Sequence, residues 1–259
     1  MERDLKNKIV VVTGGARGIG YAITEKFLAK SAYVIILDLN DKGNEAAKTL
    51  AAKYGDDRVT FIKCDVTKDL DEVTNKIFAT HKKVDVLVNN AGIINEYDLR
   101  ATIEVNTIAV IEWTIKFQEH MRLDKGGKGG TIINIASTYG YMGDPFVPFY
   151  KASKHAVVGF TKTLGHEENF KKTGVRIVAI CPSFTYTDLV VLGGTHEEER
   201  KYFKEYNSVK PWQHPEAVAD AAVEIFRVAD SGTLWSVIGG KIENVKITYI
   251  CMFASGVFL

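Results

Sequence analysis

The sequence predicts an α/β protein built as one doubly wound, parallel β-sheet with helices on both of its faces. Three observations lead to this fold class: short β-branched runs alternate with amphipathic stretches, the runs are apolar without a break, and no linker or repeat divides the chain. Continuous apolar strands that alternate with helices form crossover units, in which a parallel sheet is buried on both faces. A length of 259 residues, 46% hydrophobic and 25% charged, suits a single domain over residues 1–259.

Seven strands are expected, each in a short run rich in valine and isoleucine. In chain order these runs are 9–12, 33–37, 59–62, 84–88, 131–135, 175–180 and 233–238. The amphipathic stretches between them predict helices over 18–30, 41–54, 68–80, 99–122, 150–170 and 215–229. In such a sheet ligands bind beyond the carboxyl ends of the strands, so the residues that follow each strand are candidates for a functional site.

Composition excludes several classes of function. The net charge of +1 gives no indication of a nucleic-acid partner or an anionic membrane. Cys64, Cys181 and Cys251 are an odd set without metal-ligand spacing, so we expect reduced, structural cysteines and no metal. The first residues are charged and no apolar run reaches 18 residues, so neither a secretory signal nor a membrane span is expected. We expect a cytoplasmic protein, with an apolar tail at about 240–259 that packs on the protein or on a partner subunit.

A glycine-rich turn follows the first strand, in the sequence Thr13-Gly14-Gly15-Ala16-Arg17-Gly18-Ile19-Gly20. Glycines let the backbone turn sharply and approach a pyrophosphate, and the N-terminus of the next helix faces the negative charge. The spacing is Gly-x-x-x-Gly-x-Gly and not the commoner Gly-x-Gly-x-x-Gly. A plain turn is the alternative, but the strand before it, the helix after it and an acid further on favour nucleotide binding.

That acid is Asp38, at the end of the second strand. A carboxylate there accepts hydrogen bonds from an adenosine ribose and repels a 2′-phosphate, which favours NAD over NADP. Arg17 argues the other way, because a guanidinium can pair with the extra phosphate; it is otherwise a solvated side chain on the turn. The sequence predicts NAD, since the repulsion acts at the 2′ position itself.

Two further groups follow the third and fourth strands. Asp65 can accept a hydrogen bond from the adenine amino group, cap the helix that follows, or do both. The segment Asn89-Asn90-Ala91-Gly92 can line the cofactor, tie the strand end to its neighbours, or do both.

Tyr150 and Lys154 stand four residues apart, about one helical turn, and so share one helix face. A fixed cation beside a phenol stabilises the phenolate and lowers its pKa, which makes a proton acceptor usable nearer neutral pH. Ser137 follows the fifth strand, and its hydroxyl can hold a substrate oxygen. The alternatives are a solvated helix lysine and a serine hydrogen-bonded within a strand end.

Together these residues resemble the classical short-chain dehydrogenases/reductases, whose fold is of the Rossmann type. The resemblance covers nearly the whole chain in the family order: the glycine turn, Asn89-Asn90-Ala91-Gly92, Asn106, Ser137 and Tyr150-x-x-x-Lys154. Within the family the chain is most similar to the insect-type alcohol dehydrogenases and the hydroxyprostaglandin dehydrogenases. The resemblance implies an NAD-dependent oxidoreductase.

The resemblance also implies roles for single residues. Asn106, Ser137, Tyr150 and Lys154 are the expected catalytic residues. Tyr150 exchanges a proton with the alcohol, Lys154 holds the nicotinamide ribose and lowers the Tyr150 pKa, and Asn106 holds a water beside Lys154 unless its bond is purely structural. The expected cofactor contacts are Gly14, Arg17, Gly18, Ile19, Gly20, Asp38, Asp65, Val66, Asn90, Ala91, Gly92, Tyr150, Lys154, Pro182 and Thr187.

One position departs from the family, which has Pro-Gly where this chain has Pro182-Ser183. Serine has a less permissive backbone than glycine, so we expect a shifted loop beside the nicotinamide. This departure is the one support for an alternative function, a non-catalytic nucleotide- or lipid-binding relative that keeps the fold.

The substrate loop is expected at about 184–212, and its aromatic residues indicate an apolar pocket. Arg200 and Lys201 are read as a solvated helix face, so a hydrophobic secondary or lipid-like alcohol, or its ketone, is a better substrate than a sugar or a hydroxy acid. The resemblance further implies a homo-oligomer, a dimer or a tetramer, joined through helices 99–122 and 150–170. The expected substrate contacts are Ser137, Tyr139, Phe146, Tyr150, Phe184 and Tyr186.

Overall fold

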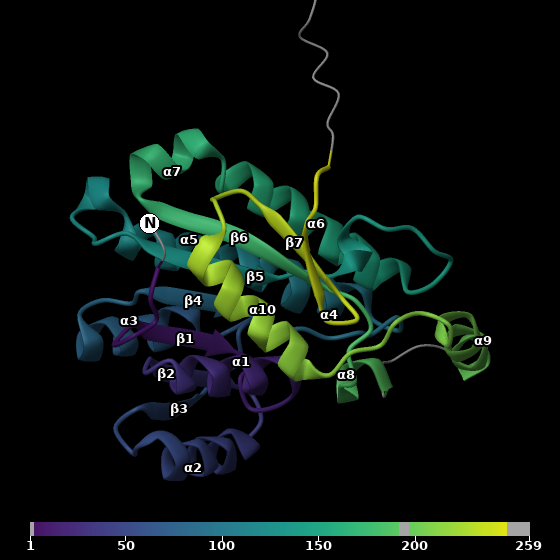
Figure 1. Ribbon diagram of the computed structural model, residues 1–259, viewed down its shortest axis with the longest axis horizontal. Coiled ribbons are helices and arrows are strands. Elements are labelled where there is room, and N and C mark those ends of the chain that lie inside the picture. Colours follow the sequence, from purple (N-terminus) through teal and green to yellow (C-terminus); the bar gives the residue numbers. More distant parts are fainter. Residues whose placement is uncertain (1–2, 192–196, 248–259) are drawn as a thin grey trace, which may run out of the picture.

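The computed structural model describes residues 3–191 and 197–247, and its centre is one sheet in the order β3-β2-β1-β4-β5-β6-β7-β8 (Figure 1). The pairs from β3 to β7 are parallel, which confirms the predicted doubly wound architecture. The strands are β1 (Ile9–Thr13), β2 (Tyr33–Asp38), β3 (Val59–Lys63), β4 (Val86–Asn89), β5 (Gly130–Ile135), β6 (Val175–Pro182), β7 (Leu234–Ile238) and β8 (Lys241–Asn244).

The eighth strand corrects the prediction of seven parallel strands. β8 pairs with β7 in the antiparallel direction, with Ile238 opposite Lys241. The two residues between them, Gly239 and Gly240, have φ of 55° and 80°. Two consecutive residues with positive φ form the tight hairpin turn that matches the twist of antiparallel strands. The beginning of the expected apolar tail is therefore an edge strand, and residues 248–259 lie outside the described part.

The expected helices are present, with two changes. They are α1 (Gly18–Ala29), α2 (Lys42–Tyr54), α3 (Leu70–His81), α4 (Leu99–Ile103), α5 (Ala109–Met121), α6 (Pro148–Leu164), α7 (Glu167–Thr173) and α10 (Pro215–Val228), with α8 (Asp188–Val191) and α9 (Glu197–Asn207) in the substrate loop. A π-helical turn over Glu104–Ile108 joins α4 to α5. The stretch predicted as one helix over 150–170 is α6 and α7, because the backbone of His166 between them is not helical, with ψ of 146°. Gly165, the C-cap residue of α6, has no room for a side chain, since a Cβ would lie 2.6 Å from Ile177 O.

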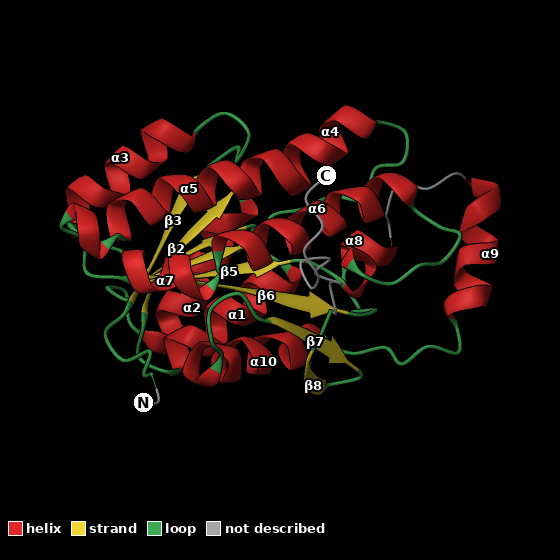
Figure 2. Cartoon of the chain, turned by 90° about the horizontal axis from the view of Figure 1, so that it is seen from above, coloured by secondary structure: helices red, strands yellow, loops and turns green. Residues whose placement is uncertain are grey.

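The helices form two layers with the sheet between them (Figure 2). Side chains from α1 and α10, such as Ile23, Phe27 and Ile225, pack on one face of the sheet. Trp113 and Phe117 of α5, together with residues of α3, pack on the other face. Successive strand residues serve opposite faces: Val10 and Val12 belong to the first cluster and Val11 to the second. Burial on both faces explains why the strands are continuously apolar.

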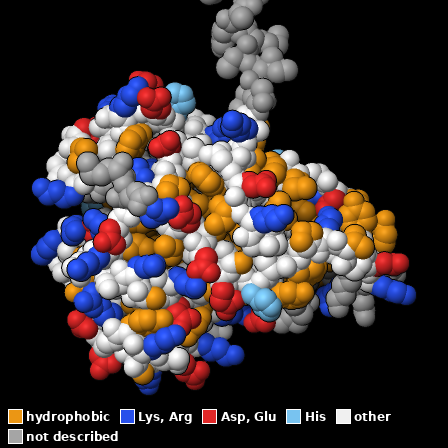
Figure 3. Space-filling model, viewed as in Figure 1, with side chains coloured by type: hydrophobic (Ala, Val, Ile, Leu, Met, Phe, Trp, Pro, Cys, Tyr) orange, Lys and Arg blue, Asp and Glu red, His pale blue; other side chains and the backbone are white. Residues whose placement is uncertain are grey.

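The strand order reverses between β1 and β4, which are neighbours in the sheet, so a crevice opens at their carboxyl ends. On the face drawn in Figure 3, acidic and basic side chains are interspersed, without a large patch of one sign. Among the described residues, no helix is both long and apolar enough to span a membrane.

Candidate active site

A cavity of about 950 Å³ lies at the carboxyl ends of the strands. One end is lined by the glycine turn and by residues that follow β2, β3 and β4, and the other by residues that follow β5 and β6 together with α8 and α9. All the residues expected to contact NAD except Gly20 line this cavity, and so do the expected substrate contacts except Phe146. The structure therefore brings together residues that are far apart in the chain, such as Arg17 and Asp188, which are 171 positions apart.

Close backbone packing explains the glycines of the turn. Gly14 has φ of 64°, and a Cβ on it would lie 2.9 Å from Ala91 Cα. A Cβ on Gly20 would lie 2.2 Å from Gly14 O and 2.5 Å from Asn90 Nδ2. Asn90 Nδ2 also donates to Thr13 O and Gly14 O, each at 3.0 Å. Asn90 therefore both lines the cavity and ties the end of β4 to the turn, so the two sequence interpretations hold together.

The acidic residues of this end are held by backbone groups. Asp38 Oδ2 accepts from Ala16 N at 3.0 Å, and its Oδ1 accepts from Asn40 N at 2.9 Å. This fixes the carboxylate directly beneath the glycine turn. Arg17 forms an exposed ion pair with Asp188 at 3.1 Å, so its guanidinium links the turn to α8.

Asp65 lines the cavity and also stabilises its own turn. Its Oδ1 accepts from Thr67 N at 3.0 Å and from Thr67 Oγ1 at 2.7 Å, and Lys68 pairs with Oδ2 at 2.9 Å. The hydrogen bond from Lys68, followed by those from Thr67, lowers the pKa of the Asp65 carboxyl. Asp65 thus stabilises its own turn at 65–68. It does not cap the following helix, because α3 begins at Leu70 with Asp69 as its N-cap residue, so the capping interpretation is wrong for the helix.

Ser137, Tyr150 and Lys154 lie together where the two ends of the cavity meet, and each is at most 8% exposed. Lys154 Nζ donates to Ile135 O at 2.9 Å and lies 5.6 Å from the centroid of the Tyr150 ring. Ser137 Oγ accepts from Tyr139 N at 3.1 Å. The expected one-turn spacing on α6 therefore places the phenol and the ammonium on the same side of the helix.

Burial dominates the ionisation of this group. It raises the pKa of Tyr150 to about 12, although a hydrogen bond with Ser137 acts in the lowering direction. It also lowers the pKa of Lys154 to about 8. The side chains of this group alone thus do not produce the lowered Tyr150 pKa expected from the sequence, because desolvation of the buried phenolate outweighs the hydrogen bond with Ser137.

Asn106 lies in the π-helical turn and is fully buried. Its Oδ1 accepts from Ile93 N and its Nδ2 donates to Ile93 O, both at 2.8 Å, and Nδ2 also donates to Ser153 Oγ at 3.1 Å. A Cβ added to Gly92 would lie 3.3 Å from Asn106 Oδ1 and 3.7 Å from Lys154 Nζ. The structural alternative is therefore present as direct hydrogen bonds, and the Asn106 carboxamide and the Lys154 ammonium both adjoin Gly92.

Aromatic side chains form the wall of the other end. Tyr139 lies edge-on to Tyr150 and to Phe184, with ring centroids 6.5 and 5.9 Å apart. Phe184 in turn packs against Phe203 at 6.1 Å and Trp212 at 5.3 Å. Ring packing of this kind gives this end of the cavity an apolar, aromatic wall, as the sequence predicts.

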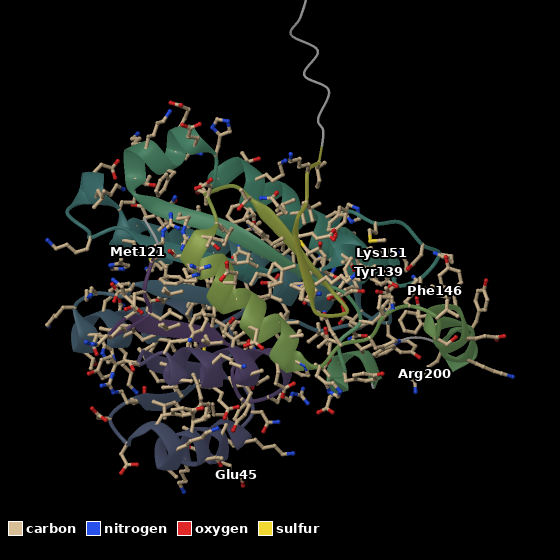
Figure 4. The ribbon with its side chains drawn as sticks, viewed as in Figure 1. Glu45, Met121, Tyr139, Phe146, Lys151 and Arg200 are labelled. Carbon is tan, nitrogen blue, oxygen red and sulfur yellow. The ribbon has the colours of Figure 1, made fainter. Side chains whose placement is uncertain are left out.

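Two predictions about this wall are wrong. Phe146 does not line the cavity; it packs against Phe203 and two tyrosines of α9, and Figure 4 shows it beside that helix. Arg200, read from the sequence as solvated, is half-buried and lines the cavity. The spacing of three residues between Arg200 and Phe203, which puts both on one helix face, is the sequence signal for this position.

Ser183 lines the cavity without a strained backbone. It is not among the residues with positive φ, and its N donates to Val237 O at 2.9 Å. A serine is compatible with this conformation, so the shift expected from the missing glycine has no basis in backbone strain here. Thr187, four residues later, lies against Gly18.

Cysteines and histidines contribute no metal centre within residues 3–191 and 197–247. Cys64 and Cys181 are free and buried, as expected, whereas Cys251 lies outside the described residues. His196 also lies outside them.

A strand-end nucleotide cradle that opens onto a buried tyrosine–lysine pair is the arrangement of an α/β oxidoreductase with a dinucleotide cofactor. Residues 8–197 match the family model described as short chain dehydrogenase, so the chain belongs to the short-chain dehydrogenase family.

Similar proteins agree with this assignment. A 15-hydroxyprostaglandin dehydrogenase [NAD(+)] of Rattus norvegicus is 34% identical over 85% of this chain and 86% of its own length. Alcohol dehydrogenase 1 of Ceratitis cosyra is 31% identical over 92% of this chain and 95% of its own. A proposed NAD(P)-dependent gluconate 5-dehydrogenase of Beutenbergia cavernae, solved with NADP at low occupancy, superposes with a TM-score of 0.77 and 30% identity, covering 92% and 97% of the two chains.

Proposed function

We propose that this chain is an NAD-dependent oxidoreductase that interconverts a hydrophobic secondary or lipid-like alcohol and its ketone or aldehyde. The observation that carries the proposal is the buried Ser137, Tyr150 and Lys154 group at the junction of a nucleotide cradle and an aromatic wall. The names of the relatives, a hydroxyprostaglandin dehydrogenase and an alcohol dehydrogenase, support the same class of substrate.

The residues of the cradle fit a dinucleotide. Gly14 and Gly20 leave no room for a side chain, so the turn packs tightly on Ala91 and on itself. A tight glycine turn that leads into a helix N-terminus suits the binding of a pyrophosphate. The Asp38 carboxylate beneath the turn favours a ribose with a free 2′-hydroxyl, hence NAD over NADP. Asp65 and Val66 are assigned to the adenine, and Pro182 and Thr187 to the nicotinamide. When bound, NAD⁺ supplies the hydride acceptor.

The chain's own side chains manage the proton and the geometry. Ser137 holds the substrate oxygen, and Tyr150 takes the hydroxyl proton during oxidation or returns it during reduction. Lys154, fixed by Ile135 O, holds ribose hydroxyls and adds positive charge beside the phenol. The aromatic wall excludes water and positions the alcohol. Oxidation requires Tyr150 in its deprotonated form. Because burial raises the pKa of the phenol, this form becomes more populated only as the pH rises, so we expect the rate of oxidation to increase with pH.

We also propose a homo-oligomer, because α5 exposes apolar side chains on the side away from the sheet. Ile115 is 40% exposed and Ile108, in the preceding π-helical turn, is 38% exposed. Light scattering on a sizing column measures the assembled mass, and a monomer at micromolar concentration contradicts this part of the proposal. Free, buried Cys64 and Cys181 support a reducing compartment such as the cytoplasm.

The proposed function is tested by absorbance at 340 nm with NAD or NADP and a panel of short, terpenoid, steroid and prostanoid secondary alcohols. Formation of NADH with at least one apolar alcohol, and preference for NAD, support it. Binding of NAD without turnover across the panel supports the non-catalytic binding protein instead.

A further inference from the structure

Helix α6 begins with two backbone donors that the helix itself cannot satisfy. Val147 precedes it in the left-handed region, with φ of 46°, and makes no capping hydrogen bond. Pro148, the first helical residue, has no N–H. The first bond within the helix runs from Lys151 N to Val147 O at 2.9 Å. The N–H groups of Phe149 and Tyr150 therefore need acceptors from elsewhere.

Glu96 supplies both acceptors. Its Oε2 accepts from Phe149 N at 3.0 Å and its Oε1 from Tyr150 N at 2.9 Å. Glu96 is 8% exposed and belongs to the loop after β4. It precedes Phe149 by 53 positions in the chain. A carboxylate at a helix N-terminus is stabilised by the helix dipole and by charge-assisted hydrogen bonds. A side chain from another segment thus holds the backbone of Tyr150 itself.

The loop that carries Glu96 is anchored at its other end. It starts with Asn90 to Gly92, which line the nucleotide end of the cavity, and the two hydrogen bonds between Ile93 and Asn106 fix its middle. Glu96 does not itself line the cavity. It therefore connects the nucleotide cradle to the first turn of α6 without touching the space for the ligands.

The position of the Tyr150 phenol follows from that first turn. Its ring lies edge-on to Tyr139, and Ser137 is close enough to influence the pKa of the phenol. A shift of the helix start moves the phenol relative to Ser137. In general, a displacement of about 1 Å at a reacting group costs about 100-fold in rate.

We propose that Glu96 is a positioning residue that sets the place of the Tyr150 phenol by holding the backbone of residues 149 and 150. The inference rests on the proposed role of Tyr150 as the acid/base. It assigns to Glu96 an effect on turnover and on the pH profile, and none on NAD affinity.

The experiment compares Glu96→Ala and Glu96→Gln with the matched control Asp98→Ala. Asp98 is two residues further along the same loop, and its Oδ1 accepts from Ala101 N at 2.9 Å as the cap of α4 and not of α6. Both alanine changes remove a capping carboxylate, but only the Glu96 carboxylate caps α6, the helix that carries Tyr150 and Lys154. The full-length proteins are assayed at 340 nm for kcat and KM from about pH 6 to about pH 11, which reaches past the ordinary pKa values of tyrosine and lysine. NAD affinity is measured by fluorescence titration.

We expect Glu96→Ala to lower kcat by about 100-fold while the Kd for NAD stays within about twofold. The apparent pKa on the rising limb of the pH–rate profile should move upward, because the phenol loses its hydrogen bond with Ser137. Glu96→Gln retains one acceptor oxygen and should recover part of the rate. Asp98→Ala should match the wild type in all three quantities.

Equal kcat and an equal pH profile in Glu96→Ala and Asp98→Ala overturn the inference. So does a loss of rate that parallels a loss of NAD-binding protein, since that is a folding defect alone. If Glu96→Ala does not fold, Glu96→Gln decides by the same criteria. Failure of the proposed function looks different: there the wild type itself forms no NADH, and both proposals fall.

Discussion

The nucleotide end of the cavity is made largely of backbone and of strand-end side chains bonded to backbone, whereas the alcohol end is made of aromatic side chains carried by a loop. Asp38 is fixed by Ala16 N and Asn40 N, and Asn90 by the carbonyls of the glycine turn. Phe184, Phe203 and Trp212 are held chiefly by one another. A cradle made of backbone tolerates little change in sequence, while a wall made of side chains can be altered to suit another alcohol. Tyr150 and Lys154 stand between the two.

The largest expected effect is at this junction. Lys154→Met should lower kcat by at least about 100-fold, because the ribose contact and the charge beside the phenol are lost. The same change should raise the free energy of unfolding by about 1–3 kcal/mol, because a buried ammonium is replaced by an apolar chain. Lys151→Met is the control: that lysine pairs with the buried Asp144, so its removal should destabilise the protein. Urea unfolding measures the free energy of unfolding of both variants. If Lys154→Met is less stable than the wild type, burial of the Lys154 ammonium does not cost stability as proposed.

The pH dependence of stability sharpens this result. Burial lowers the pKa of Lys154 from 10.5 to about 8, so between these values the unfolded chain binds more protons than the folded one. Stability should therefore rise with pH from about 8 towards about 10 in the wild type relative to Lys154→Met. Above about 10 the raised pKa of Tyr150 acts in the opposite direction, since the unfolded tyrosine ionises first. If the free energy of unfolding depends on pH in the same way in both proteins, the lowered pKa of Lys154 is contradicted.

A change in the cradle should act on cofactor binding. Gly20→Ala puts a Cβ 2.2 Å from Gly14 O, so the turn must move, and the Kd for NAD should rise by about 100-fold. Gly143→Ala is the matched control, because a Cβ there meets nothing within 4 Å. Unchanged NAD affinity in Gly20→Ala, measured by fluorescence titration, breaks the distinction between a backbone cradle and a side-chain wall.

A change in the wall should act on the alcohol and leave NAD binding alone. Phe203→Ala removes a ring that lines the cavity, and the KM for a bulky apolar alcohol should rise by about tenfold. Tyr202→Ala, on the neighbouring residue, alters a side chain that is 56% exposed and outside the lining, and it should change KM little. Steady-state kinetics on both variants test this, and equal effects would show that α9 does not form the wall as described.

The smallest expected effect concerns cofactor preference. Asp38→Ala removes the carboxylate beneath the turn, and the ratio of kcat/KM for NAD to that for NADP should fall by about five- to tenfold. Asp41→Ala, three residues on, removes an exposed carboxylate paired with Lys63 and should leave the ratio unchanged. The same ratio in both variants counts against the ribose role of Asp38.

Strand runs and strand-end motifs were predictable because each depends on residues that are close together in the chain. The apolar runs, the glycine turn and the Tyr150–Lys154 spacing depend on local rules, and the structure places them as expected. The β8 strand was also encoded locally, in Gly239-Gly240, but a two-residue signal is easily passed over. At the separation of α6 from α7, only glycine fits position 165, because a side chain there would meet Ile177 O of β6, and no local pattern contains this packing.

The alcohol end was less predictable because its lining depends on how α9 packs. Phe146 and Phe203 are equally apolar in sequence, yet Phe203 lines the cavity and Phe146 does not. Arg200 reads as solvated in a highly charged run, and only the direction of the helix brings it to the cavity. The Tyr150 pKa was missed for a related reason, since spacing shows the nearby lysine but not the burial of both groups.

The most direct test of the central claim, that Tyr150 is the acid/base of an NAD-dependent dehydrogenase, is one comparison of wild type with Tyr150→Phe. NAD binding by fluorescence and NADH formation at 340 nm are measured on the same preparations with the best alcohol. The account predicts a Kd for NAD within about twofold of wild type and a loss of turnover of about 100- to 10,000-fold. Turnover by Tyr150→Phe near the wild-type rate would contradict it.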